Sequence, residues 1–258
     1  MNAETNQLAA NVARVNERIE RAASRAGRQG DEITLIGVSK MHPAEQVREL
    51  YEAGVRHFGE NRVQEWESKR ALLSDVDATW HLIGHLQSNK VARAVQVFRT
   101  IDSVDSIALA ERVDRAKKDL NTEGTEGTEK KEESGGGRLR VLVEVRLDPG
   151  TSKSGVSDEE LPRLVEAVLG LPHLKLRGLM GVPPYFEDAA KVRPFFRRLR
   201  VMRDALRLRL GKEILPVLSM GMSHDFEVAI EEGATEIRVG TALFGERTPG
   251  QPETSQQG

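Results

Sequence analysis

Lys40 is the residue of this chain best placed for covalent chemistry. It directly follows the apolar run Ile33–Ser39, at the point where a buried strand would end. A lysine amine that has lost its proton forms an imine with an aldehyde or a ketone. A lysine at a strand end can also simply mark the return of the chain to solvent, and Pro43 predicts a tight turn there. The other strand ends therefore decide between these two interpretations.

Two segments near the end of the chain have the composition of a phosphate site. They are Met220-Gly221-Met222-Ser223 and Arg238-Val239-Gly240-Thr241, and each ends an apolar run. Backbone N–H groups at a helix N-terminus are typical phosphate ligands, and Ser223 is predicted to cap the helix that follows it. Gly240 and Thr241 add N–H groups, with no side chain at the glycine. An ordinary cap and an ordinary turn would each explain one of these features, but their occurrence at two successive strand ends favours a phosphate site.

Arg238 is the third candidate, because it lies two residues before Gly240 and so shares a strand face with it. A buried arginine needs an acceptor, which could be a carboxylate such as Glu60 or the ring nitrogen of a ligand. Asn61 is a further polar candidate at a strand end. An aldehyde, a phosphate and a ring nitrogen together describe pyridoxal 5′-phosphate (PLP), which is the cofactor that we predict.

A metal site formed by His81 and His85 is the alternative that we consider for the histidines. Residues four apart on a strand share a face, but no third ligand is evident in the sequence. We therefore predict no metal, and no carboxylate pair stands out as a catalytic pair of the glycosidase type.

The elements that must position these residues follow a regular order. The first helix is predicted from an apolar stripe that ends near Gly27, with Leu8, Val12, Val15, Ile19 and Ala22 on one face. Eight apolar or β-branched runs then alternate with helix-like segments, which predicts parallel strands joined by helices. The runs are Ile33–Ser39, Arg56–Gly59, Thr79–Gly84, Thr100–Val104, Leu139–Leu147, Leu174–Met180, Ile214–Met220 and Glu236–Val239.

Eight such strands in about 250 residues favour an α/β fold consisting of a single (β/α)8 TIM-type barrel. A doubly wound open sheet has the same alternation and stays open as an alternative. The segment after the eighth strand is too short and too rich in proline for an eighth barrel helix. We expect the extra N-terminal helix to cover the gap that this leaves.

Residues 1–247 are accordingly predicted to form one PLP-binding barrel with one insertion at about 121–137. This insertion reads NTEGTEGTEKKEESGGG and contains no apolar residue, so we predict that it is disordered. The tail 248–258 is predicted to be disordered for the same reason.

Composition restricts the class of protein further. The 38 Lys+Arg residues nearly balance the 40 Asp+Glu residues, which gives no indication of nucleic acid as a partner. Cysteine is absent, so disulfides and thiolate chemistry are excluded. No apolar run approaches the roughly 18–20 residues of a membrane span, and the N-terminus lacks an apolar signal core. We predict a cytoplasmic monomer that binds neither nucleic acid nor membrane.

The chain resembles the pyridoxal phosphate homeostasis protein family in several long segments. These are LIGVSK ending at Lys40, HFGENRVQE at 57–65, WHLIGHLQSNK at 80–90, SKSG at 152–155, RGLMGVPP at 177–184 and LSMGMSHDFEVAIEEGATEIRVGTALFGER at 218–247. The resemblance implies a barrel like the N-terminal domain of alanine racemase, with PLP held as a Schiff base on Lys40. It also implies phosphate contacts from Ser223, Gly240 and Thr241, and a contact of Arg238 with the pyridine nitrogen.

Three functions stay open at this stage. The prediction that we favour is a non-catalytic PLP carrier in vitamin B6 and amino-acid homeostasis, with PLP-dependent apoenzymes as candidate partners. The alternatives are a PLP-dependent amino-acid racemase and a barrel enzyme whose Lys40 forms an imine with a sugar-phosphate substrate. The resemblance to barrel racemases implies that the second base of a racemase would be a tyrosine. The chain has only two tyrosines, Tyr51, predicted on a helix, and Tyr185, predicted in a loop.

Overall fold

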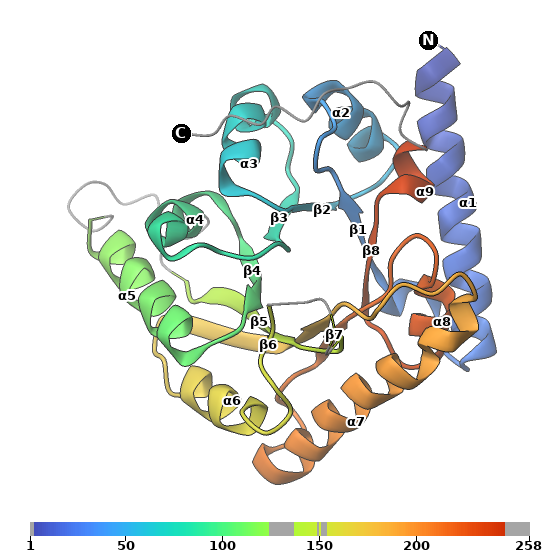
Figure 1. Cartoon of the computed structure of the whole chain (residues 1–258). Coiled ribbons are helices and arrows are strands. Elements are labelled where there is room, and N and C mark those ends of the chain that lie inside the picture. The colour runs from blue at the N-terminus through green and yellow to red at the C-terminus, as the bar shows by residue number, and fades with distance from the viewer. Residues whose placement is uncertain (1–2, 124–136, 149, 151–153, 246–258) are drawn as a thin grey trace.

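The computed structural model of the chain describes residues 3–123, 137–148, 150 and 154–245, and the sheet in it is a closed barrel (Figure 1). All eight strand pairs are parallel, and β1 pairs with β8 through Thr34↔Glu236 and Gly37↔Val239. Closure confirms the barrel and excludes the doubly wound sheet. The strands are β1 (Thr34–Val38), β2 (His57–Glu60), β3 (Thr79–Leu82), β4 (Thr100–Val104), β5 (Leu139–Val145), β6 (Leu174–Gly181), β7 (Val217–Ser219) and β8 (Glu236–Val239).

Helices surround the strands, as each parallel connection requires. They are α1 (Ala3–Arg25), α2 (Ala44–Glu52), α3 (Val63–Arg70), α4 (Val91–Val97), α5 (Ile107–Glu123), α6 (Leu161–Leu169), α7 (Arg193–Leu210), α8 (Phe226–Glu231) and α9 (Thr241–Phe244).

The N-terminal helix occupies the place of the missing barrel helix, as predicted. α1 packs against α8, α9 and α2, and its apolar stripe of Leu8, Val12, Val15 and Ile19 is buried. The Asn11 side-chain amide donates a hydrogen bond of 2.7 Å to the backbone oxygen of Leu243 in α9. Because α9 is a single turn, it could not by itself cover the strands beside it.

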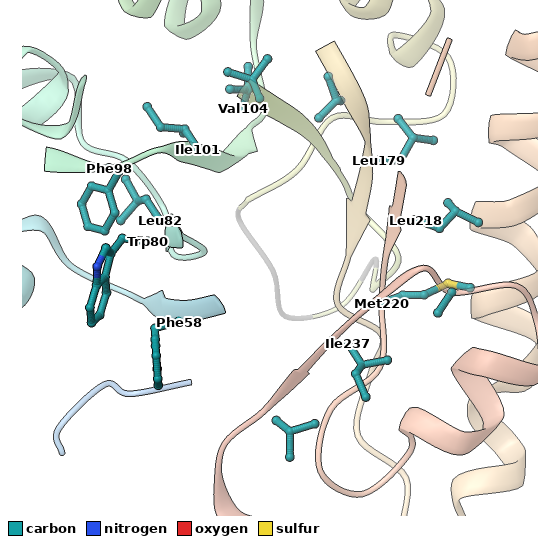
Figure 2. Close-up of a cluster of buried hydrophobic side chains, with 14 of the residues drawn as sticks. Phe58, Trp80, Leu82, Phe98, Ile101, Val104, Leu179, Leu218, Met220 and Ile237 are labelled. Atoms are coloured by element: carbon teal, nitrogen blue, oxygen red, sulfur yellow. The ribbon is translucent and has the colours of Figure 1, made fainter. Parts of the chain in front are cut away.

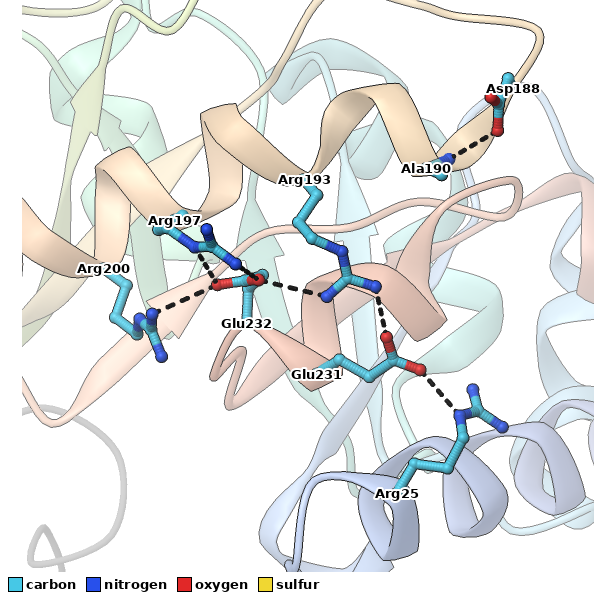
Figure 3. Close-up of polar contacts among 8 residues, drawn as sticks. All are labelled: Arg25, Asp188, Ala190, Arg193, Arg197, Arg200, Glu231 and Glu232. Carbon is cyan, nitrogen blue, oxygen red and sulfur yellow. Dashed lines mark hydrogen bonds and ion pairs between the residues drawn. The ribbon is translucent and has the colours of Figure 1, made fainter.

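Ion pairs at the end of α8 join three helices (Figure 3). Glu231 pairs with Arg25 of α1 at 2.7 Å and with Arg193 of α7 at 2.5 Å. The neighbouring Glu232 is almost fully buried, and it pairs with three arginines of α7, which are Arg193, Arg197 and Arg200. These contacts attach α1 and α7 to opposite sides of α8.

Alternation along the strands separates an apolar layer from a polar barrel interior. Phe58, Trp80, Leu82 and Ile101 pack between the strands and the helices (Figure 2). Their sequence neighbours therefore point into the barrel, because successive side chains of a strand face opposite sides. Those neighbours include His57, His81 and Asp102, so the interior differs from the aliphatic filling that is usual in such barrels.

Most strands differ from the predicted runs by one or two residues, and three differences are larger. Asn121–Glu123 continue α5, where the Thr122 hydroxyl bonds to the backbone oxygen of Lys118, so the helix runs into the predicted insertion. β7 begins only at Val217, because Leu215 has a φ of 52°, which strand geometry does not allow. Thr241 starts the one-turn helix α9, whereas no element had been predicted there. The remaining predictions for 124–136 and 248–258 concern residues outside the described ranges.

Within the described ranges, none of the helices combines the length and the apolar character that crossing a membrane requires.

Candidate functional site

Closure of the barrel brings Lys40 next to the end of the eighth strand. Because Gly37 lies beside Val239 in the register, Gly240 follows at the level of Val38, and a Cβ on Gly240 would lie 3.6 Å from Val38. Lys40 is half-buried and makes no hydrogen bond or ion pair with any of the residues that the structure describes. Its amine is therefore available to a ligand at this end of the barrel.

A buried charge pair holds the backbone just before Lys40. The Lys69 ammonium of α3 donates to the backbone oxygen of Ser39 at 2.8 Å and to Glu60 Oε1 at 2.7 Å. The Ser39 hydroxyl donates to the same carboxylate oxygen at 2.7 Å. Burial raises the pKa of Glu60, and the charge of Lys69 opposes this. Sequence reasoning did not find this role for Lys69, because only the fold brings α3 against the end of β1.

The two residues after Lys40 are held as well. Met41 has a φ of 63°, which is uncommon for a side chain other than glycine, and its N–H donates to the Glu65 carboxylate of α3. The His42 ring stacks on Phe244 of α9, with the ring centroids 3.8 Å apart. Lys40 thus projects from a turn that α3 and α9 position from both sides.

The predicted phosphate segments meet through Ser223. Its hydroxyl oxygen accepts hydrogen bonds from the backbone N–H groups of Gly240 and Ala242, both at 3.2 Å. Two N–H groups that converge on one oxygen have the arrangement that a phosphate oxygen needs. Ala242 was not predicted as a site residue, because only its backbone N–H takes part and an alanine in the sequence gives no indication of this role. Thr241 lies exposed between these two donors.

Ser223 does not cap the helix that follows it, and that prediction was wrong. α8 starts only at Phe226, with Asp225 at the cap position, and Asp225 Oδ1 accepts a bond of 2.6 Å from the N–H of Met222. The chain makes this turn at Gly221, whose φ is 95° and where a Cβ would lie 2.6 Å from that of Ala229. Only glycine fits that position.

Arg238 is buried at the same end of the barrel. Its guanidinium donates to the Ser219 hydroxyl at 2.8 Å and to the backbone oxygen of Gly181 at 3.0 Å. Burial lowers its pKa, which the carboxylates around it oppose. Glu60, considered above as its partner, faces α3 and pairs with Lys69 instead, because residues 59 and 60 point to opposite sides of β2.

Asn61 follows β2 at the same barrel end and is half-buried. Gly84, after β3, approaches its backbone so closely that a Cβ would lie 2.4 Å from the Asn61 oxygen. The described contacts place Asn61 on the rim of the site without joining its amide to Lys40.

His81 and His85 do not form a common site. His81 lies inside the barrel, where Nδ1 bonds to Asp102 at 2.9 Å and Nε2 bonds to His57 at 3.0 Å. His85 lies outside, 3.7 Å from Asp105. Ligand atoms of His81, Asp102 and Glu236 come within 4.8 Å of one another. Both nitrogens of His81 are already hydrogen-bonded, so this group is a polar network of the interior in which no nitrogen is left to bind a metal.

Several groups of this interior have strongly shifted pKa values. Burial, with a further contribution from Asp102, raises the pKa of Glu236 to about 7. Burial and Asp105 raise the pKa of Glu144 to about 7, against the opposing charge of Arg238. Burial lowers the pKa of His57 to about 4, so this ring is neutral at pH 7. Shifted carboxylates beside a buried arginine are typical of functional sites.

The two tyrosines lie apart. Tyr51 is on α2, as predicted, and its ring carries the Arg56 guanidinium 4.3 Å above it. Tyr185 is 76% exposed on the loop after β6, with its ring 5.5 Å from that of His224. Of the two, only Tyr185 lies at the barrel end of Lys40.

The fold and the site define a (β/α)8 barrel protein whose strand ends combine a free lysine, converging backbone donors and a buried arginine. Residues 7–248 match the family described as alanine racemase, N-terminal domain. The "pyridoxal phosphate homeostasis protein" of Aquifex aeolicus is 46% identical over 92% of this chain and 96% of that protein. A protein of the same description from Pseudomonas aeruginosa is 43% identical over 95% of this chain and 98% of its own length.

Solved structures agree with these relatives. PipY of Synechococcus elongatus, solved with PLP bound, has a TM-score of 0.74 and 42% identity, and the match covers 88% of this chain and all of PipY. Alanine racemase of Clostridium difficile has a TM-score of 0.67 at 16% identity, over 95% of this chain and 57% of the racemase, which is a likeness of fold alone. The chain belongs to the pyridoxal phosphate homeostasis protein family.

Replacing Lys69 by methionine should destabilise the protein strongly, because it leaves the buried carboxylate of Glu60 without its partner. We expect a loss of about 3–5 kcal/mol in the free energy of unfolding, measured by urea denaturation. The double variant Lys69→Met/Glu60→Leu should regain most of this loss, since no buried charge remains unpaired. The exposed Lys118→Met is the matched control, with an expected change below about 0.5 kcal/mol. A double variant no more stable than Lys69→Met would contradict the pairing.

Glu144 should make the protein less stable as the pH rises. Folded, it keeps its proton up to a pKa of about 7, whereas the unfolded chain loses that proton at about 4.3. Its stabilising contribution is therefore complete below the unfolded pKa and is lost as the pH rises through 7. Between about pH 5 and 8, the free energy of unfolding should fall less in Glu144→Gln than in the wild type, by roughly 1–3 kcal/mol. Urea denaturation across this range measures it, with the exposed Glu159→Gln as the control; parallel curves for Glu144→Gln and wild type would refute it.

Proposed function

We propose that this protein binds PLP as a reversible Schiff base on Lys40 and acts in intracellular PLP and amino-acid homeostasis without catalysing a reaction of its own. The observation that carries the proposal is that Lys40, Arg238 and the Ser223 hydroxyl lie at the same barrel end, where the hydroxyl accepts from the N–H groups of Gly240 and Ala242. It is supported by relatives described as PLP homeostasis proteins and by the PLP-bound structure of PipY.

The residues present fit this cofactor. PLP carries an aldehyde, which a lysine amine can bind, a phosphate group and a ring nitrogen that accepts hydrogen bonds. The N–H groups of Gly240 and Ala242, now shared by the Ser223 hydroxyl, would turn to the phosphate, with Thr241 adding its exposed hydroxyl. The bonds that Arg238 makes to Ser219 and Gly181 fix its guanidinium for the ring nitrogen. Asn61 would border the ligand from the rim.

The position of Arg238 also favours a carrier that holds the cofactor over an enzyme that uses it in catalysis. A guanidinium is a donor without acceptor capacity, so a ring nitrogen in contact with it stays unprotonated. PLP acts as an electron sink, and an unprotonated ring weakens that action. The second base of a racemase would have to be Tyr185, which points largely to solvent. A cofactor held in this way can exchange with solution, and PLP-dependent apoenzymes are the proposed recipients.

Trapping the lysine tests the proposal directly. Purified protein mixed with PLP should absorb at about 420 nm, as expected for an imine of PLP, and borohydride should bleach the band and leave the label on Lys40. The variant Lys40→Ala should lose both signals, while Lys90→Ala, on the same barrel end, should keep them. The proposal would be excluded if the label were found on another lysine while Lys40 stayed unmodified. It would also be excluded if a sugar-phosphate aldehyde labelled the protein and PLP did not.

Exchange of the amino-acid α-proton in deuterated water distinguishes the carrier function from a racemase function of this protein. We expect PLP-loaded protein to exchange the α-proton of alanine no faster than free PLP does, because an unprotonated ring nitrogen beside Arg238 weakens the electron sink that removal of this proton needs. Nuclear magnetic resonance follows the exchange, with Tyr185→Phe as the matched variant. Rapid exchange that both Lys40→Ala and Tyr185→Phe abolish would assign the protein to the racemases.

A further inference from the structure

One polar residue interrupts the buried stripe of α1. Among the side chains of α1 that the structure describes, Asn11 is the only buried one that is polar, and it is 3% exposed. Leu8 and Val15, about one turn before and after it, are buried in the hydrophobic core. A buried amide is costly unless it is hydrogen-bonded. The contacts of Asn11 therefore indicate why this position is not apolar.

Hydrogen bonds within α1 fix the orientation of the Asn11 amide. Its Oδ1 accepts from Gln7 Nε2 at 2.8 Å and from Arg14 Nη2 at 2.7 Å, and these two donors lie about one turn before it and one turn after it. With the oxygen held in this way, Nδ2 points out of α1 and donates to the backbone oxygen of Leu243 in α9 at 2.7 Å. The amide is therefore a fixed link between two helices that lie side by side (Figure 1).

The helix at the other end of this link, α9, carries part of the proposed phosphate site. The N–H of Ala242 in α9 and the N–H of Gly240 just before it converge on the Ser223 hydroxyl. α9 is a single turn of four residues, whereas an isolated helix needs roughly 12–15 residues to be stable in water. The direction of these two N–H groups therefore depends on contacts that hold α9 from outside.

The side chains of Asn11 and His42 hold the C-terminal half of α9. Asn11 donates to the Leu243 oxygen, and the His42 ring stacks on Phe244. The last carbonyl groups of a helix have no donor within that helix, and Leu243 is fully buried. Asn11 thus supplies a donor that α9 itself cannot supply. Without the amide, the Leu243 oxygen would lose this bond in a buried place, which favours movement of the whole turn.

We propose that Asn11 is a positioning residue for the phosphate group of the ligand. Through its bond to Leu243 it fixes α9, and with α9 the N–H groups of Gly240 and Ala242. It thereby sets the preference of the protein for an aldehyde that carries a phosphate over one that does not. This role rests on the proposed function, since it concerns how the same ligand is held, and it makes α1 a determinant of ligand choice.

Two ligands that differ in the phosphate test this role. PLP carries the phosphate, whereas 5′-deoxypyridoxal keeps the ring and the aldehyde without it. Titration of the full-length, PLP-free protein with each ligand, followed by the imine absorbance at about 420 nm, gives two dissociation constants. Asn11→Leu, which has a similar volume but no hydrogen-bonding group, should raise the Kd of PLP by about tenfold or more. The Kd of 5′-deoxypyridoxal should change by less than about twofold, because this ligand does not use α9.

Asn16→Leu is the matched control, because it makes the same change on the exposed face of the same helix and should leave both Kd values unchanged. Circular dichroism and urea denaturation of each variant establish that it is folded. An unchanged Kd of PLP in Asn11→Leu would overturn the proposal. An equal loss of affinity for both ligands would also overturn it, since a general loosening of the barrel weakens the binding of both.

Amide hydrogen exchange tests the positioning of α9 without any ligand. In the PLP-free protein, the amides of α9 should exchange about tenfold faster in Asn11→Leu than in the wild type, whereas those of α6 should be unaffected. Asn11→Ala, which removes the amide with less steric change, should give the same result in both measurements if Asn11→Leu does not fold. Unchanged exchange in α9 would overturn the proposal. A wild-type protein that forms no imine with PLP would instead refute the proposed function, so the two failures are distinguishable.

Discussion

The pairing of β1 with β8 is the constraint on which the site depends. It closes the barrel and sets Gly240 beside Val38, so that two segments about 200 residues apart in sequence share one rim. The helices on either side of this seam reinforce it: Asn11 of α1 bonds to α9, and His42 stacks on Phe244. α1 is therefore part of the support of the site, because it covers the strands where the barrel lacks its eighth full helix.

The interior of this barrel is polar where most barrels are aliphatic. Buried ionisable groups are costly unless they are paired, and His57, His81 and Asp102 satisfy one another in a continuous chain of hydrogen bonds. Arg238 and Glu144 extend the polar region toward the ligand end. Such an interior contributes less to stability than packed aliphatic side chains would, but it supplies fixed charges below the rim.

Much of the fold could be predicted because it rests on local patterns. The alternation of eight apolar runs with helix-like segments, and the stripe on the first helix, depend only on residues close together in the chain. Errors arose where tertiary contacts override a local preference. Ser223 has the residue type of a helix cap, yet its hydroxyl bonds across to Gly240 and Ala242. Leu215 lies within an apolar run but adopts a positive φ. Thr241 begins a helix of a single turn, which is too short for a hydrophobic periodicity to be visible in the sequence.

The sequence by itself determined the type of chemistry: a lysine at a strand end, small residues at two later strand ends and an arginine on the last strand. Their residue types and spacing are properties of the chain, and so is the family resemblance that they carry. Only the tertiary structure decided the partners. Lys69 pairs with Glu60 and orients the turn that carries Lys40, Arg238 bonds to Ser219, and His81 faces Asp102 rather than His85. Barrel closure and the direction of each side chain determine these contacts, and neither can be inferred from the spacing of residues along the chain.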